Sequence, residues 1–272
     1  MITATNSRRL MVNNIFIDLP RHAIVRRRTS KNSWASKMRT TALKKMMLGK
    51  ATDPDDIAAD LWKLRCWSPA EWLTKFFYKV VTEKKVPGSW QESTTIPIWK
   101  QKGSPVDGTN YRPIRLLSHS MKIFERIVDG RIRDIVQLST NQSGFVAGSG
   151  TIDAIHAASV PVERNREKQK PLHLAFLDLR LEKAFDHVPR EVIWYTLRQH
   201  GVPEELIEWV RILYSGPKSR VRAPAGTSAE FPISVGVHQG SALSPLLFNV
   251  VMMPFRETFS SLPPGRCCMQ MT

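Results

Sequence analysis

Cysteine is almost absent from this chain of 272 residues, which contains only Cys66, Cys267 and Cys268. Two of the three are adjacent and none has the spacing of a zinc site, so the sequence excludes a disulfide framework and a cysteine-based zinc fold. No apolar run reaches the roughly 18 residues that a membrane-spanning helix needs. No apolar segment follows the first charges, as a secretory signal would require. We therefore expect an intracellular location, nuclear or cytoplasmic, and no membrane partner.

Acidic residues are also in short supply. The chain carries 24 Asp and Glu against 40 Lys and Arg, which gives a net charge of +16 and a pI of about 10.1. Such a balance favours a polyanionic partner, most often nucleic acid. The excess is concentrated in residues 1–50, where 12 Lys or Arg stand against the single Asp18. Two interpretations of this head stay open: a solvated or targeting arm, and a nucleic-acid-binding segment.

Hydrophobic periodicity is weak at the start of the chain and strong later. Residues 1–40 show little of it, so we expect this basic segment to be disordered. Residues 41–84 are expected to form a helical N-terminal extension, with its strongest helix over 69–84. Four apolar residues of that helix recur at helical spacing and are expected in the core: Trp72, Phe76, Phe77 and Val80.

From residue 85 onward, short strands alternate with amphipathic helices, which is typical of an α/β or α+β layered domain. Helices are expected over 121–136, 153–168, 190–200 and 204–214, and after Ser244-Pro245. Strands are expected over 94–99, 172–179, 220–223 and 231–237, the last two as a hairpin around Gly226. An exposed loop is expected over 100–109.

The chemistry of the chain is concentrated in a few motifs. Asn110-Tyr-Arg-Pro-Ile114 comes first, Phe176-Leu-Asp-Leu179 and Ala184-Phe-Asp186 follow, and Gly236-Val-His-Gln-Gly-Ser-Ala-Leu-Ser-Pro-Leu-Leu-Phe248 comes last. Asp178 has apolar neighbours in a strand that would otherwise be buried. A buried carboxylate is costly unless it is paired or bound to a metal. In the last motif, Ser244 and Pro245 suit the N-cap and first positions of a helix.

In this order, the motifs resemble those of the reverse transcriptases of non-LTR (LINE-type) retrotransposons, closest to the RTE group. Asn141-Gln-Ser-Gly-Phe145, Thr151-Ile-Asp-Ala154 and Lys50-Ala-Thr-Asp-Pro-Asp-Asp-Ile57 match as well, so the resemblance covers about residues 42–252. It implies a right-hand polymerase fold with fingers over 85–170, a partial palm over 171–252 and no thumb. It also implies an RNA-directed DNA polymerase that uses an RNA template, a DNA primer, dNTP and Mg²⁺.

The resemblance assigns roles to matching residues. Asp178 becomes the candidate catalytic carboxylate and metal ligand. The nucleotide-binding residues that it implies are Arg112, Phe185, Gln239, Gly240, Lys100 and Lys102. Arginine suits the triphosphate because its planar fork binds phosphate in a bidentate manner. Phe185 would be the steric gate against the ribose 2′-hydroxyl, with a plain core role as the alternative, and solvated side chains remain the alternative for the two lysines.

The spacing of the second motif departs from the family pattern. The family places its catalytic Asp six residues before the Asp of Ala-Phe-Asp, but that position is Arg180, and Asp178 lies two residues earlier. Two inserted residues keep the face of a strand and advance it by about 6.6 Å. Either a bulge absorbs the insertion and Asp178 stays near the metal ions, or Arg180 takes its place; both alternatives stay open.

A second departure concerns the Tyr-Ala-Asp-Asp motif, which the family places after a position equivalent to Met252. No Asp follows Asp186 in the 272 residues. The codons for Cys267 to Thr272, read one base earlier, permit Leu-Leu-Tyr-Ala-Asp-Asp. Our hypothesis is therefore that residues 253–272 are an out-of-frame translation of the missing motif, which the DNA sequence over these codons would test.

The missing carboxylates bear on activity because polymerases of this kind use two divalent ions about 4 Å apart. Asp178 alone leaves that site incomplete, and the thiolates of Cys267 and Cys268 suit soft metals rather than Mg²⁺. We therefore expect a truncated reverse transcriptase domain without activity by itself. The alternative is a non-catalytic nucleic-acid-binding remnant.

Overall fold

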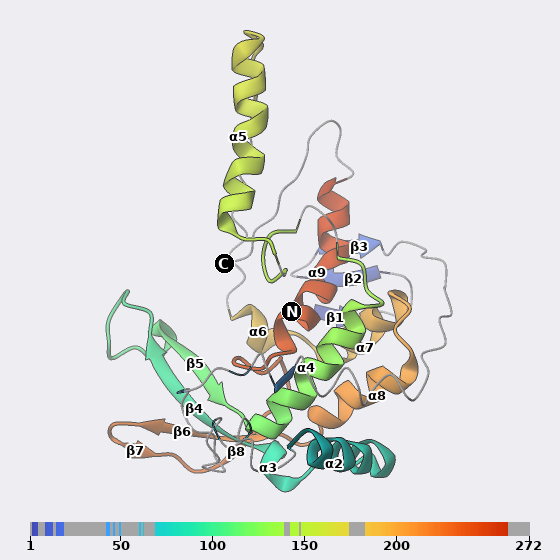
Figure 1. Cartoon of the computed structure of the whole chain (residues 1–272). Helices are drawn as coiled ribbons and strands as arrows, with labels where there is room; N and C mark the ends of the chain where they lie inside the picture. The colour runs from blue at the N-terminus through green and yellow to red at the C-terminus, as the bar shows by residue number, and fades with distance from the viewer. Residues whose placement is uncertain are drawn as a thin grey trace.

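The computed structural model describes residues 2–4, 9–12, 15–18, 42–43, 69–138, 142–146, 148–173 and 183–260, together with Met46, Gly49, Asp60 and Trp62. Within these residues helices and strands are mixed, which confirms the α/β class (Figure 1). The larger sheet lies on one side of a cluster formed by several of the helices, whereas one helix projects away from the body. No helix among the described residues is long and apolar enough to cross a membrane.

The larger sheet has the order β5-β4-β6-β7, and β8 also pairs with β6. Its strands are β4 (Glu92–Trp99), β5 (Tyr111–Leu116), β6 (Lys218–Ala223), β7 (Gly226–Thr227) and β8 (Phe231–Pro232). β4 runs antiparallel to β5 and parallel to β6. The predicted strand over 94–99 and the predicted exposed loop after it are confirmed. In the predicted hairpin, the second strand ends at Pro232 rather than at residue 237.

β5 was not predicted from the sequence. Pro113 lies in its centre, opposite Pro97 of β4. Proline cannot donate a hydrogen bond to a neighbouring strand, so a proline in a short run argues against a central strand. β5 is at the end of the strand order, and an edge strand tolerates proline because one of its sides needs no donor.

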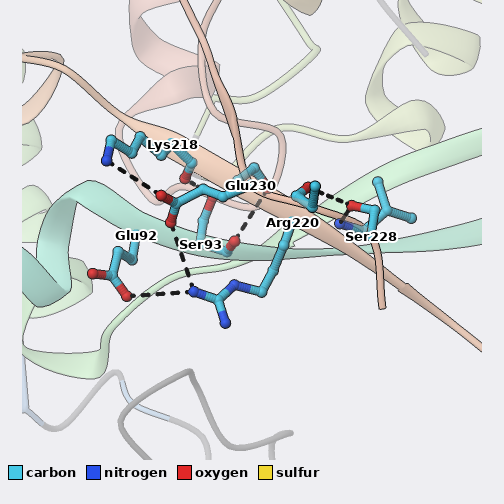
Figure 2. A network of polar contacts seen from close by, with 9 residues as sticks. Glu92, Ser93, Lys218, Arg220, Ser228 and Glu230 are labelled. Carbon is cyan, nitrogen blue, oxygen red and sulfur yellow. Dashed lines mark hydrogen bonds and ion pairs between the residues drawn. The ribbon is translucent and has the colours of Figure 1, made fainter. Parts of the chain in front are cut away.

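Buried hydroxyl groups attach β6 to β4. Ser93 Oγ donates to the carbonyl of Lys218 at 3.0 Å, and Ser219 Oγ donates to the carbonyl of Ser93 at 3.1 Å. Thr95 Oγ1 and Ser219 Oγ lie 2.7 Å apart. Exposed ion pairs with distances of 3.2 to 4.0 Å surround this contact, formed by Glu92, Lys218, Arg220 and Glu230 (Figure 2). Exposed pairs contribute little to stability, so the buried hydroxyls are the stronger connection.

The helices agree well with the predicted ranges. They are α2 (Pro69–Glu83), α3 (Gly88–Gln91), α4 (His119–Arg133), α5 (Thr151–Glu167), α6 (Ala184–His187), α7 (Arg190–Gln199), α8 (Glu204–Leu213) and α9 (Ser244–Ser260). α5 has no buried residue and is the helix that projects from the body in Figure 1. α9 continues past Met252, with Pro254 inside it.

Aromatic side chains from four helices build the centre of the core. The ring of Phe124 on α4 is fully buried and lies 5.2 Å from Phe77, 5.4 Å from Trp90 and 6.4 Å from Trp209, measured between ring centroids. Pairs at such distances add about 0.5–1.5 kcal/mol each beyond the area that they bury. This cluster holds α2, α3, α4 and α8 together.

One predicted core residue of α2 is wrong. Trp72 is 47% exposed, although its ring stacks on Phe76 at 5.0 Å. The buried stripe runs through Leu73, Phe77 and Val80 instead. These positions are spaced by four and three residues and share one face, whereas Trp72 is one position earlier and points roughly 100° away around the helix axis.

The N-terminal segment differs from the expected disorder at three short strands. β1 (Ile2–Ala4), β2 (Arg9–Val12) and β3 (Ile15–Asp18) form an antiparallel sheet. Runs of three or four residues are too short to give a clear periodicity, which explains why the sequence did not indicate them. β1 contacts α7 and β3 contacts α9. Residues 19–41 lie outside the described residues.

Of the predicted strand over 172–179, the structure describes Leu172 and His173. Leu172 and His173 belong to no strand, and Leu172 is 39% exposed. Residues 174–182 lie outside the described part of the chain, and this includes both Asp178 and Arg180.

Candidate functional site

Three segments that are distant in sequence meet at the Gly236–Ser241 turn, which precedes α9. The Gly236 amide donates to the Val188 carbonyl at 3.0 Å, and the Val237 amide donates to the Phe185 carbonyl at 2.8 Å. On the other side, the Arg115 amide of β5 donates to the Gln239 carbonyl at 2.8 Å. Backbone hydrogen bonds therefore bring the Ala-Phe-Asp motif, the strand that contains Arg-Pro-Ile and this turn into one place.

The two glycines of the turn make these contacts possible. Gly236 has φ +81°, and a Cβ there would lie 2.7 Å from the carbonyl oxygens of Phe185 and Asp186. Gly240 has φ +114°, and its Cβ would lie 2.5 Å from the Arg115 carbonyl oxygen. Positive φ and close backbone approach both favour glycine. The resemblance assigned a close approach at Gly240 to a nucleotide; in the structure a protein carbonyl already occupies the space that a Cβ would need.

Glu125 of α4 binds the C-terminal part of the turn. Its side chain is fully buried, Oε1 accepts a hydrogen bond from Ser241 Oγ at 2.7 Å, and Oε2 accepts one from the Ala242 amide at 3.0 Å. Burial raises the pKa of this carboxyl to about 7, and the two hydrogen bonds partly oppose that rise. Sequence reasoning missed Glu125. Its signal is helical spacing, because Met121, Glu125, Val128 and Ile132 fall on one face of α4.

The N-terminus of α9 is capped by a different serine from the one predicted. Ser241 Oγ accepts hydrogen bonds from the Leu243 amide at 3.0 Å and the Ser244 amide at 3.3 Å. Ser244 was the expected cap, but it is already the first residue of the helix. The hydroxyl that satisfies the free amides must precede the first turn, and here the Ser241 hydroxyl does so.

His238 belongs to the turn, and its side chain is almost completely buried. It is 2% exposed, its ring lies 4.6 Å from that of Tyr214, and neither ring nitrogen has a hydrogen-bond partner in the described part of the chain. Burial, followed by the charges of Arg115 and Arg190, lowers the pKa of His238 to about 3. Burial also raises the pKa of Tyr214 to about 12. His238 is therefore neutral at physiological pH.

The two arginines of β5 occupy opposite faces of the strand. Arg112 pairs with Ile98 of β4, and Arg115 pairs with Thr95. Positions separated by three residues alternate in a strand. The Arg115 side chain is 10% exposed, and its Nη2 lies 4.0 Å from Asp186 Oδ1. Burial lowers its pKa. The structure thus brings Arg115, which sequence reasoning passed over, against the Ala-Phe-Asp segment, whereas the predicted Arg112 is exposed on the other face.

The remaining predicted residues lie around this centre. Lys100 and Lys102 are in the loop that joins β4 to β5; Lys100 Nζ donates to the Thr109 carbonyl at 2.8 Å, and Lys102 is exposed. Phe185 is half-buried and stacks on Phe248 at 4.7 Å, with Phe145 edge-on at 6.1 Å. This packing agrees with a core role for Phe185 and leaves its role as a gate untested.

The Asn-Gln-Ser-Gly-Phe segment is attached to α9. Gln142 Nε2 donates to the Gly144 carbonyl at 2.7 Å and to Asn249 Oδ1 at 3.3 Å. Asn249 Nδ2 donates to the same carbonyl at 3.2 Å. These buried bonds place Phe145 next to Phe185 and so connect a fourth motif to the site.

Comparisons with known proteins place the site in context. The sequence profile of the family "Reverse transcriptase (RNA-dependent DNA polymerase)" matches residues 99–268. The chain is 30% identical over 202 residues to the "Retrovirus-related Pol polyprotein from type-1 retrotransposable element R2" of Nasonia vitripennis, which covers 74% of this chain and 19% of that protein. It is 28% identical over 211 residues to the "RNA-directed DNA polymerase from mobile element jockey" of Drosophila melanogaster, covering 76% and 23%. The chain thus spans about a fifth of the length of these relatives.

Proposed function

Because this chain belongs to the reverse transcriptase family and carries the reverse transcriptase domain of non-LTR retrotransposon Pol proteins, we propose that it binds an RNA template, a primer and dNTP without joining nucleotides by itself. The observation that carries this proposal is the meeting of β5, the Ala-Phe-Asp segment and the Gly236–Ser241 turn. The polymerase activity is that of relatives that are named as RNA-directed DNA polymerases.

The fingers would include the β4–β5 hairpin, and the incomplete palm would include the turn and α9. Arg112 is exposed on the hairpin and Lys102 is exposed in its loop, and a guanidinium can hold a phosphate with two hydrogen bonds. Gln239 Oε1 is buried and has no hydrogen-bond partner within the described ranges. A buried acceptor without a donor is costly, so a sugar hydroxyl of a bound nucleotide would supply what this group lacks.

The described residues by themselves supply no complete ligand set for the divalent ions that the family uses. They contain no group of three His, Cys, Asp or Glu side chains able to hold a metal ion. Asp186 has the Arg115 guanidinium 4.0 Å away, and a nearby cation disfavours metal binding. Asp178 lies outside the described residues, and no Asp follows Asp186 in the sequence. The out-of-frame origin of residues 253–272 stays a proposal for the DNA sequence to test.

Primer extension on an RNA template, with Mg²⁺ or Mn²⁺, tests the catalytic part. We expect no incorporation above that of an Asp178→Ala variant, because one carboxylate cannot hold two ions. In the same buffers, RNA binding should weaken steeply as salt rises, since phosphate contacts release counterions. Nucleotide incorporation above the control would contradict the predicted inactivity. Weak RNA binding that does not change with salt concentration would contradict the proposal that the partner is a nucleic acid.

Arg112→Ala tests the nucleotide-binding role of the hairpin. Loss of a charge-assisted bond to phosphate should weaken dNTP binding by about tenfold, from roughly 1.5 kcal/mol. The measurement is a titration with a fluorescent dNTP analogue. Lys75→Ala is the matched control, because Lys75 is an exposed cation on α2 that pairs with Glu71 at 3.3 Å. Unchanged affinity in Arg112→Ala would count against this residue and direct attention to Arg115.

A further inference from the structure

The turn that precedes α9 is held from two sides. On one side, the Gln239 carbonyl accepts the Arg115 amide of β5 at 2.8 Å. On the other side, the Glu125 carboxylate accepts Ser241 Oγ and the Ala242 amide, at 2.7 and 3.0 Å. Gly240 lies between these two attachments. The backbone conformation of the turn is therefore determined by α4 as well as by β5.

The carboxylate also acts beyond the two groups that it touches. Ser241 Oγ, which donates to Glu125, accepts the Leu243 and Ser244 amides at the start of α9. Its single proton is directed toward the carboxylate, so its lone pairs are free to accept these amides. Without Glu125, the hydroxyl would lose the partner that orients it, and the Ala242 amide would lose its acceptor.

A carboxylate at this place is not explained by packing. The Glu125 side chain is fully buried. It lies on the same face of α4 as Met121, Val128 and Ile132, which are all buried in the core. An apolar side chain would fill the position without the cost of removing a charge from water. What the carboxylate adds is two hydrogen-bond acceptors directed at consecutive residues of the turn.

We propose that Glu125 is a positioning residue, which fixes the Gly236–Ser241 turn from α4 so that Gln239 is presented to a nucleotide. This inference rests on the proposed function, in which the turn receives the nucleotide. Glu125 itself touches no substrate; it acts through Ser241 and Ala242.

Amide hydrogen exchange of residues 239–244 tests the anchoring in the full chain. In Glu125→Ala, we expect the Ala242 amide and its neighbours to exchange at least about tenfold faster, because this amide loses its buried hydrogen-bond acceptor. Glu125→Gln should restore only part of the protection, since its single amide oxygen can accept from Ser241 Oγ or from the Ala242 amide but cannot replace both carboxylate oxygens. Val128→Ala is the control: it removes a buried side chain from the same helix face but no hydrogen bond to the turn.

Titration of the same variants with a fluorescent dNTP analogue links the anchor to binding. Glu125→Ala should bind about tenfold more weakly than Val128→Ala, at a temperature where both variants remain folded, and Glu125→Gln should recover part of the affinity. Equal exchange in Glu125→Ala and Val128→Ala would overturn the inference, whatever the binding result. Absence of nucleotide binding in the parent chain, together with faster exchange in Glu125→Ala, would instead overturn the proposed function and leave only the anchor.

Discussion

Gly240→Ala is expected to lower the free energy of unfolding by roughly 3–5 kcal/mol. A Cβ at this position would lie 2.5 Å from the Arg115 carbonyl oxygen, and the backbone has φ +114°. A backbone oxygen cannot rotate away as a side chain can, so either the turn or β5 must shift. Because the Arg115 amide also donates to the Gln239 carbonyl, such a shift would break the contact between the strand and the turn.

Urea denaturation of the full chain measures this effect, and a second glycine provides the control. Gly130 lies inside α4, is exposed, and has nothing within 4 Å of an added Cβ. Gly130→Ala should therefore stabilise the chain by about 1 kcal/mol through helix propensity. If Gly240→Ala also left stability unchanged or raised it, the close packing of the turn on β5 would be wrong.

The pH dependence of stability is expected to have a plateau between about pH 4.5 and 6.5. Two buried groups near the turn set it, with pKa shifts in opposite directions. The pKa of Glu125 rises from 4.5 to about 7, and the pKa of His238 falls from 6.5 to about 3. At about 1.4 kcal/mol per unit of pKa, these shifts correspond to roughly 3 and 5 kcal/mol.

The sign of each contribution follows from proton binding. Between pH 4.5 and 7 the folded chain holds the proton on Glu125 that the unfolded chain has released, so stability falls as pH rises. Between pH 3 and 6.5 the unfolded chain holds a proton on His238 that the folded chain rejects, so stability rises with pH. Where the two ranges overlap, the slopes cancel. Stability should therefore rise up to about pH 4.5 and fall above about pH 6.5.

Nearby charged groups also contribute to the pKa shifts of Glu125 and His238. Lys122 and Asp129 act on Glu125 with opposite signs, and Glu125 in turn raises the pKa of Tyr214. Arg115 and Arg190 both lower the pKa of His238. These interactions are secondary, because burial is the largest cause for both groups.

Two variants separate the contributions in urea denaturation series over pH. In Glu125→Gln the rise with pH should continue to about 6.5, because only His238 still titrates. In His238→Phe, which keeps a ring against Tyr214, stability should already fall above about pH 4.5. Parallel profiles for the parent and both variants would show that neither group is buried as the structure has it.

The helices were the most predictable part of the fold, because their information is local. The periodicity over 69–84 is enough to locate α2, and the same holds for α4, α7 and α8 to within a few residues. The detailed burial was less predictable. Trp72 and Leu73 are adjacent and both apolar, and only the position of α2 against Phe124 and Trp90 decides which one is covered.

Predictions for the site succeeded where one motif carried the information and failed where the contact is non-local. The turn before α9 was expected, whereas the nucleotide-binding role of Gly240 stays a prediction. Glu125 and Arg115 were not, because their roles depend on partners more than 70 residues away, at Ser241 and Asp186. Asp178, the central residue of the expected chemistry, lies outside the described residues and stays a prediction.

The sequence by itself determined the family, the mixed α/β class and the positions of the helices, because motif order and periodicity are properties of neighbouring residues. It also determined that no Asp follows Asp186. Only the tertiary structure decided that Arg115 rather than Arg112 faces Asp186, and that Glu125 holds the turn. Those outcomes depend on strand register and on the packing of α4, which bring together side chains that are far apart in the sequence. The spacing of neighbouring residues contains no information about such contacts.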